Sequence, residues 1–229
     1  MSIDTNLKAI YDKINTVALS CGREPDEVQL VAVSKRFPVT AIEEAYAAGH
    51  TVFGENYIQE AEEKAAQLGG KCTLHFIGHL QRNKAKIAAR IFDVIETIDS
   101  FKLANTLNRH LEDLGRSMKI LLQVNIGEDE KKSGMAAQQT EQLLREIGQL
   151  PHLEVIGLMT MPPFTDDPED ARPYFRQLKQ LADSLAGKGL FANERRVELS
   201  MGMSNDYHVA IEEGATIIRV GTAIFGQRK

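Results

Sequence analysis

Short apolar runs alternate along the chain with longer segments whose apolar residues recur at helical spacing. This alternation is typical of β/α units that build a parallel sheet. The runs are rich in Val, Ile and Leu, as expected for strands that are buried on both faces of the sheet. The pattern predicts eight strands, at 28–35, 51–56, 73–78, 94–99, 118–126, 153–161, 196–201 and 217–225.

Segments of helical period separate these strands, and an amphipathic helix over 3–17 precedes the first one. Eight β/α repeats in 229 residues fit a TIM barrel, which typically needs roughly 250 residues. An open doubly wound sheet is the alternative, but no GxGxxG motif opens a helix. We therefore predict an α/β fold, a single TIM (β/α)8 barrel domain spanning 1–229 with an extra N-terminal helix. Its other helices include 41–48, 58–68, 140–150 and 207–213.

Composition narrows the class of protein. Apolar residues make up 43% of the chain and charged residues 26%, which excludes a disordered chain. A net charge of −5 gives no attraction to nucleic acid. Two cysteines, Cys21 and Cys72, are too few for a disulfide framework and indicate a reducing, cytoplasmic location. No apolar run approaches the roughly 18 residues of a membrane span, and the polar N-terminus is unlike a signal peptide.

In a TIM barrel the chemistry lies at the C-terminal ends of the strands. The first predicted strand ends at Lys35, where partial desolvation would favour a neutral amine able to form a Schiff base. A lysine that extends to solvent is the alternative. The second strand ends at Asn56, which either binds a ligand or caps the next helix, and Glu55 beside it is an acid or an ion-pair partner.

The third strand carries two histidines, His75 and His79. Four residues of a strand span roughly 13 Å, which is too far for joint metal ligation, so we predict no metal site. The basic stretch 81–86 that follows is typical of a solvated helix face. Met159 and Met161 lie at the end of the sixth strand. They are either core residues or residues that line the binding site of a ring-shaped ligand.

The last two strands carry features that suit an anion. Ser204 follows the seventh strand as a candidate N-cap, and the amides of a helix start bind phosphate. The eighth strand places Arg219 and Gly221 on one face, with Thr222 beside them. A buried arginine must contact a ligand or form an ion pair. The loops after strands seven and eight often hold phosphate in TIM barrels.

An amine and a phosphate site at one barrel mouth suit an aldehyde that carries a phosphate. Pyridoxal 5′-phosphate (PLP) fits this description, and so does the sugar-phosphate substrate of a Schiff-base aldolase. The residues alone leave both open.

The sequence resembles a known family in several linked motifs. VAVSK, FGENYIQE, LHFIGHLQRNK, GLMTMPP, LSMGMSND and RVGTAIFG are similar to those of the pyridoxal-phosphate homeostasis proteins, and the likeness covers nearly the whole chain. This family has one TIM-barrel domain, similar to the N-terminal domain of alanine racemase. His79 stands where the family usually has proline, which affects only the expected shape of that loop.

The resemblance implies roles for eight residues. Lys35 would form a covalent aldimine with PLP, and Arg219 would face the pyridine nitrogen. Asn56 would lie close to the cofactor. The phosphate would be held by Ser204, Gly221 and Thr222, with Ser200 and Met203 nearby.

The resemblance also implies a function, a carrier that holds PLP and takes part in PLP and amino-acid homeostasis without an established turnover reaction or catalytic residue. PLP-dependent apo-enzymes would be recipients. The alternative is a monomeric fold-type III PLP enzyme such as an amino-acid racemase. A guanidinium beside the ring nitrogen disfavours its protonation, which weakens the ring as an electron sink. We expect a monomer, because the chain has no room for the second domain that completes a racemase.

Overall fold

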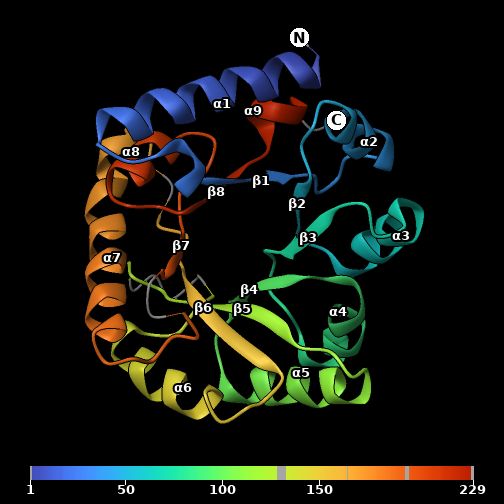
Figure 1. Cartoon of the computed structure of the whole chain (residues 1–229), viewed down its shortest axis with the longest axis vertical. Helices are drawn as coiled ribbons and strands as arrows, with labels where there is room; N and C mark the ends of the chain where they lie inside the picture. Colours follow the sequence, from blue (N-terminus) through green and yellow to red (C-terminus); the bar gives the residue numbers. More distant parts are fainter. Residues whose placement is uncertain (1, 128–132, 164, 194–195, 228–229) are drawn as a thin grey trace.

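The computed structural model describes residues 2–127, 133–163, 165–193 and 196–227, and its centre is a closed barrel of eight parallel strands in sequence order (Figure 1). This confirms the predicted TIM barrel. The strands are β1 (Gln29–Val33), β2 (Val52–Glu55), β3 (Thr73–Phe76), β4 (Val94–Ile98), β5 (Met118–Gln123), β6 (Leu153–Met159), β7 (Glu198–Ser200) and β8 (Ile217–Val220).

Helices surround the barrel on its outer side (Figure 1). The α-helices are α1 (Ile3–Ser20), α2 (Val39–Ala47), α3 (Ile58–Leu68), α4 (Ala85–Ile91), α5 (Phe101–Asp113), α6 (Thr140–Ile147), α7 (Arg172–Ala186), α8 (Tyr207–Glu212) and α9 (Thr222–Phe225). Short 3-10 helices lie at Pro25–Glu27, Arg82–Lys84, Ala137–Gln139 and Pro168–Ala171.

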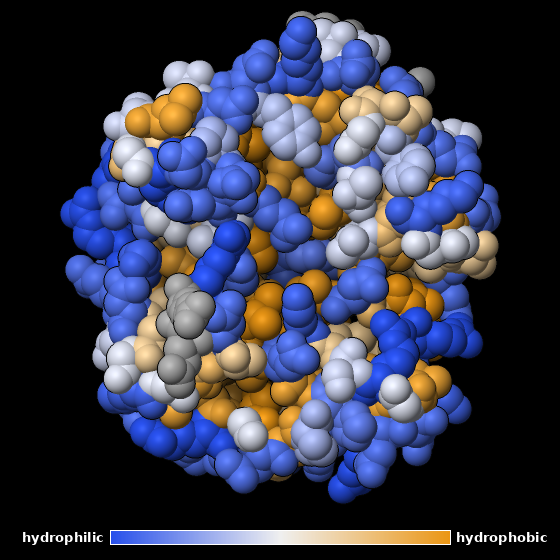
Figure 2. Space-filling view, viewed as in Figure 1, coloured by the Kyte–Doolittle hydropathy of each residue, from blue (hydrophilic) through white to orange (hydrophobic). Residues whose placement is uncertain are grey.

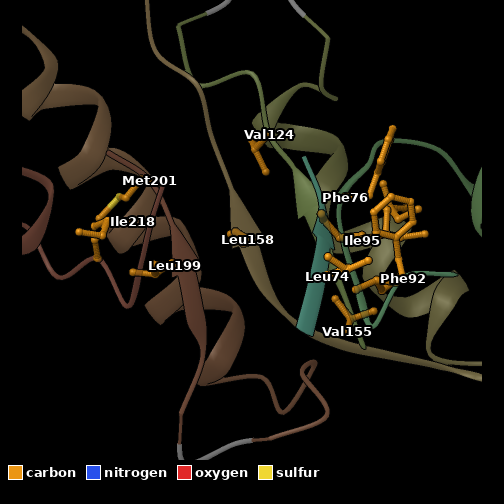
Figure 3. Close-up of a cluster of buried hydrophobic side chains, with 14 of the residues drawn as sticks. Leu74, Phe76, Phe92, Ile95, Val124, Val155, Leu158, Leu199, Met201 and Ile218 are labelled. Atoms are coloured by element: carbon orange, nitrogen blue, oxygen red, sulfur yellow. The ribbon is translucent and has the colours of Figure 1, made fainter. Parts of the chain in front are cut away.

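Side chains alternate between two apolar layers, as strands with a two-residue period require. The larger layer lies between the strands and the helices. Figure 3 shows Leu74, Phe76 and Ile95 grouped with Phe92 on one side of this layer. A smaller cluster fills the inside of the barrel with Val31, Val94, Leu121, Met159 and Ile217. Glu96 and Arg219 lie two residues after Val94 and Ile217 of this cluster, so they share its face of β4 and β8.

The N-terminal helix α1 completes the helical ring. It packs against α2, α8 and α9, and lies across β8 and β1 in Figure 1. Its buried face carries Leu7, Ile10, Ile14, Val17 and Ala18. Within the described residues, β8 is followed by the four-residue helix α9, and α1 packs over this end of the chain.

The end of β8 differs from the prediction. The apolar run 217–225 suggested one strand, but β8 ends at Val220 and α9 begins at Thr222. Gly221 has φ −117° and ψ −76°, which ends the extended backbone of β8. An apolar run of this length fits a strand or a buried helix equally well.

Within the described residues, no helix combines the length and the apolarity needed to cross a membrane.

His50 joins α1 to the start of β2 and generates a prediction about pH. Its Nε2 donates to Val52 O over 2.7 Å, since a carbonyl only accepts, so its Nδ1 accepts from the Tyr11 hydroxyl at 2.8 Å. Burial lowers the pKa of His50, against the hydrogen bond to Val52. The unfolded chain therefore takes up this proton first as the pH falls below about 6.5.

We expect stability that is full above about pH 6.5 and lost as the pH falls through the lowered pKa of His50, by up to about 1.4 kcal/mol per pH unit. Urea unfolding of the wild type and of His50→Gln between pH 8 and pH 5 measures this. The variant should lose less stability over the range. An identical pH dependence in both proteins would show that the pKa of His50 is the same in the folded and in the unfolded chain.

Candidate functional site

A cavity of about 460 Å³ opens at the C-terminal ends of the strands. Figure 2 shows apolar residues inside a hollow near the centre of the face, within a mostly hydrophilic rim. Among the described residues, the cavity is lined by Val33, Lys35, Asn56, Ile77, Met161, Thr165, Met203, Ser204, Asn205, Asp206, Arg219, Gly221 and Thr222. Seven of the eight predicted site residues are in this lining, and Ser200 lies outside it.

Lys35 stands on a tight turn just after β1. Phe37 N donates to Ser34 O over 3.1 Å, so the turn comprises Ser34 to Phe37, with Lys35 in its second position. Arg36, in the third position, has φ +63°, a left-handed conformation that bulky residues rarely adopt. Arg36 N donates to Glu60 Oε1 at 2.6 Å, which holds the turn in this conformation.

A buried ion cluster lies behind this turn, between the barrel and α3. Lys64 Nζ donates to Ser34 O at 2.8 Å, to Glu55 Oε1 at 2.7 Å and to Glu60 Oε1 at 2.6 Å. The Ser34 hydroxyl also donates to Glu55 Oε1 at 2.7 Å. Burial raises the pKa of Glu55, and Lys64 offsets part of that rise. Glu55 therefore belongs to this cluster as an ion-pair partner, one of the two roles predicted for it.

Asn56 lies in the cavity wall at the end of β2. Its Oδ1 is buried and accepts no hydrogen bond from any described residue. The wall is tight here, since a Cβ at Gly78 would lie 2.2 Å from Asn56 O. A buried acceptor without a donor costs free energy, so Asn56 fits a ligand-binding position better than a helix-capping one. The N-cap of α3 is Tyr57.

Three groups from the last two loops form a polar cup. Gly221 N donates to Ser204 Oγ over 3.3 Å, and the hydroxyls of Ser204 and Thr222 are also 3.3 Å apart. The prediction that Ser204 caps the next helix is wrong, because α8 begins at Tyr207 and its N-cap is Asp206. The side chain of Ser204 turns across to β8 instead.

Asp206 lies beside this cup in the cavity lining. Its Oδ1 accepts from Met203 N at 2.6 Å, which closes the loop after β7. Burial raises the pKa of the Asp206 carboxyl, although the hydrogen bond from Met203 lowers it. The sequence singled out Ser204 in this loop and missed Asp206, because both residues are good helix caps.

Arg219 forms the floor of the cavity. It is 3% exposed, and it donates to Ser200 Oγ through Nη1 and to Thr160 O through Nη2, at 2.8 Å for the latter. Glu96 Oε2 is 3.7 Å from Nη1. Arg219 therefore forms the buried ion pair that was one of its two predicted roles, and it also lines the cavity, where the predicted ligand contact stays a prediction.

Glu96 is fully buried beneath Arg219. Its Oε1 is 2.6 Å from His75 Nδ1, and its Oε2 accepts from the Ser200 hydroxyl at 2.5 Å. Burial alone would raise the pKa of Glu96, but His75, Arg219 and Ser200 together hold it below its usual value. Sequence reasoning missed Glu96, although the argument that singled out Arg219, a charge inside an apolar strand, applies equally to it.

The two histidines in and after β3 have different surroundings. His75 is buried against Glu96, whereas His79 is exposed and 3.5 Å from Ser133 Oγ. Among the described residues, no group of three or more His, Cys, Asp or Glu side chains could hold a metal ion.

Comparisons with known proteins agree with this fold. Residues 5–229 match the family model described as alanine racemase, N-terminal domain. The chain is 41% identical to the pyridoxal phosphate homeostasis protein of Haemophilus influenzae, over 100% of this chain and 97% of that one. It is 38% identical to PipY of Synechococcus elongatus with PLP bound, with a TM-score of 0.85 over 98% of this chain and all of that one. A Clostridium difficile alanine racemase, at 16% identity and a TM-score of 0.77, shares the fold over 56% of its length.

A closed barrel of eight parallel strands, with an amine, a polar cup and a buried guanidinium at its mouth, places the chain in the class of TIM-barrel proteins. Within this class, the chain belongs to the alanine racemase N-terminal domain family and, in it, to the pyridoxal phosphate homeostasis proteins.

The ion cluster behind Lys35 generates a stability prediction. Lys64→Met should lower the free energy of unfolding by about 3–5 kcal/mol at neutral pH, because Glu55 then loses its buried charge partner. The loss should shrink at acidic pH, where Glu55 takes up a proton. Urea unfolding measures both, with Lys71→Met, an exposed lysine, as the control. Equal losses in the two variants would mean that the cluster adds nothing to stability.

Proposed function

We propose that this protein is a PLP carrier that holds the cofactor as a Schiff base on Lys35 and takes part in PLP and amino-acid homeostasis. The observation that carries the proposal is the convergence of Lys35, the Ser204–Gly221–Thr222 cup and Arg219 on one cavity. The cavity volume of about 460 Å³ lies in the range of small-ligand sites. PLP bound to PipY and the names of the relatives support the choice of ligand.

Each part of PLP has a matching group in the proposal. The Lys35 amine adds to the aldehyde carbon, a C=N bond forms, and the aldehyde oxygen leaves as water. The phosphate takes donors from Gly221 N and from the hydroxyls of Ser204 and Thr222. The 3.3 Å bond between Gly221 N and Ser204 Oγ is long for a hydrogen bond and is readily exchanged for one to a phosphate oxygen.

The ring would lie between these two ends. Val33, Ile77 and Met161 supply apolar lining, and Arg219, in the same lining, would donate to the ring nitrogen. The unsatisfied Oδ1 of Asn56 marks this side chain as a further polar contact to the cofactor. Met203 completes the wall, and Ser200 acts from below through its hydrogen bond with Arg219.

Asp206 limits how tightly a phosphate is held. A carboxylate in the same cavity repels a phosphate dianion, and the raised pKa of Asp206 moderates this repulsion. A carrier needs such a balance, because it must release what it binds. We propose a cytoplasmic monomer that delivers PLP to PLP-dependent apo-enzymes.

The alternative is a fold-type III amino-acid enzyme such as a racemase. Racemisation needs a second base on the face opposite the lysine. Among the described lining residues, the ionisable side chains are Lys35, Asp206 and Arg219, and Asp206 is already bonded to Met203 N. This favours a carrier without turnover.

The first test maps the covalent bond. The purified protein is loaded with PLP, reduced with borohydride, digested and analysed by mass spectrometry. We expect visible absorbance before reduction and a pyridoxyl group on Lys35, with both lost in Lys35→Ala. Lys84→Ala, outside the cavity lining, is the control and should label like the wild type. A label on another lysine would refute the site, and a protein that never takes up PLP would leave the sugar-phosphate aldolase as the better reading.

The second test separates the carrier from the enzyme. PLP-loaded protein is incubated with single amino-acid enantiomers in deuterated water, and α-deuterium is followed by NMR. We expect incorporation no faster than with Lys35→Ala, because a charged guanidinium beside the ring nitrogen would disfavour the carbanion that exchange requires. Rapid exchange that depends on Lys35 would instead establish a turnover reaction.

A further inference from the structure

Four strands contribute one polar layer inside the barrel, directly beneath the cavity. It consists of His75 from β3, Glu96 from β4, Ser200 from β7 and Arg219 from β8, and each residue is at most 3% exposed. Below this layer the barrel interior is apolar. Charges in such surroundings are costly unless each is paired and hydrogen-bonded, so the arrangement of this layer is tightly constrained.

The hydrogen-bond directions in the layer follow from the donors available. A guanidinium only donates, so Ser200 Oγ accepts from Arg219 Nη1. Ser200 has a single proton, and it goes to Glu96 Oε2 at 2.5 Å. Glu96 Oε2 is therefore an acceptor. Against the effect of burial, His75, Arg219 and Ser200 hold the pKa of Glu96 below its usual value, so the carboxyl is ionised and its other oxygen accepts from His75 Nδ1 at 2.6 Å. Both carboxylate oxygens of Glu96 are used, and the carboxylate has little freedom to rotate.

This series of hydrogen bonds holds the guanidinium of Arg219 from below. Nη1 is tied to Ser200 of β7 and Nη2 to the carbonyl of Thr160, the residue that follows β6, so the plane of the guanidinium is set by two segments other than its own strand. A guanidinium has five N–H groups, and those that are not engaged below remain for the cavity. To neutralise the charge of Arg219, Glu96 would only need to lie near it. The hydrogen bonds through Ser200 also set the direction in which the guanidinium points.

We propose that Glu96, acting through Ser200, is a positioning residue that aims Arg219 at the ring nitrogen of PLP. The inference rests on the proposed function and extends it to residues that do not line the cavity. His75 holds Glu96 on its far side, so the chain runs from β3 through β4 and β7 to β8. Loss of any link frees the guanidinium to turn without removing it.

The test compares PLP with its carbocyclic analogue, in which C–H replaces the ring nitrogen. The wild type should bind PLP at least about tenfold more tightly, because the analogue leaves a charged donor unpaired. Ser200→Ala keeps both charges but breaks the link, and its ratio should fall toward one. The ratio cancels effects on the phosphate and on overall stability, so a merely structural role would not change it.

Two further variants, at Glu96, should lower the ratio of the two affinities by different amounts. Glu96→Gln keeps an oxygen that can accept from Ser200, and it should keep part of the discrimination. Glu96→Met has no such acceptor and should lose it. Glu198→Gln is the control, since this carboxyl starts β7 and pairs with Arg196 at 2.9 Å, away from the layer. If Glu96→Met does not fold, Ser200→Ala alone decides.

The outcomes separate the inference from the proposed function. Wild-type discrimination between the two ligands in Ser200→Ala and Glu96→Met would overturn the positioning role and leave the Lys35 site intact. A wild type that binds both ligands equally would also overturn it, because Arg219 would then not face the ring nitrogen. A wild type that binds neither ligand would refute the proposed function itself.

Discussion

Glu96 and Arg219 bring opposite charges into the interior of a closed barrel, and the upper half of the molecule is arranged around them. An unpaired charge at that depth would cost several kcal/mol, so each of the two residues stabilises the charge of the other. The pair needs β4 and β8, which are not neighbours in the barrel, and Ser200 of β7 joins them. Barrel closure is therefore a condition of the site, since only closure brings these side chains across the interior to one another.

A second charged cluster lies on the outer side of β1 and complements the first. Lys64 bonds to Ser34 O while Glu60 holds Arg36 N in a left-handed turn, and Lys35 stands between these two anchors. Val31 pairs in register with Arg219 across the β1–β8 closure, which relates the lysine turn to the guanidinium. The relative position of Lys35 and Arg219 thus depends on the strand register and on two ion clusters, one on each side of the sheet.

The sequence predicted the elements whose signals are local. The alternation of apolar runs predicts the barrel, and 58–68 was confirmed residue for residue as α3. Lys35, Arg219 and Gly221 could be singled out because each is a charged residue or a glycine within or directly after an apolar strand. Glu96 and His75 could not be paired from sequence, since their contact joins residues 21 apart through barrel geometry. Ser204 and Asp206 are equally good caps in isolation, and only packing of the loop against β8 decides between them.

Under the proposed assignment, the same floor that binds the ring also limits its chemistry. The pKa of Glu96 is held below its usual value, so the carboxylate stays ionised and balances a charged Arg219. A charged guanidinium at the ring nitrogen can donate a hydrogen bond but disfavours a second proton there. Exchange of an imine between amines needs no electron withdrawal into the ring, whereas carbanion formation does. If Arg219 faces the ring nitrogen as proposed, a floor of this kind therefore favours imine exchange over carbanion formation.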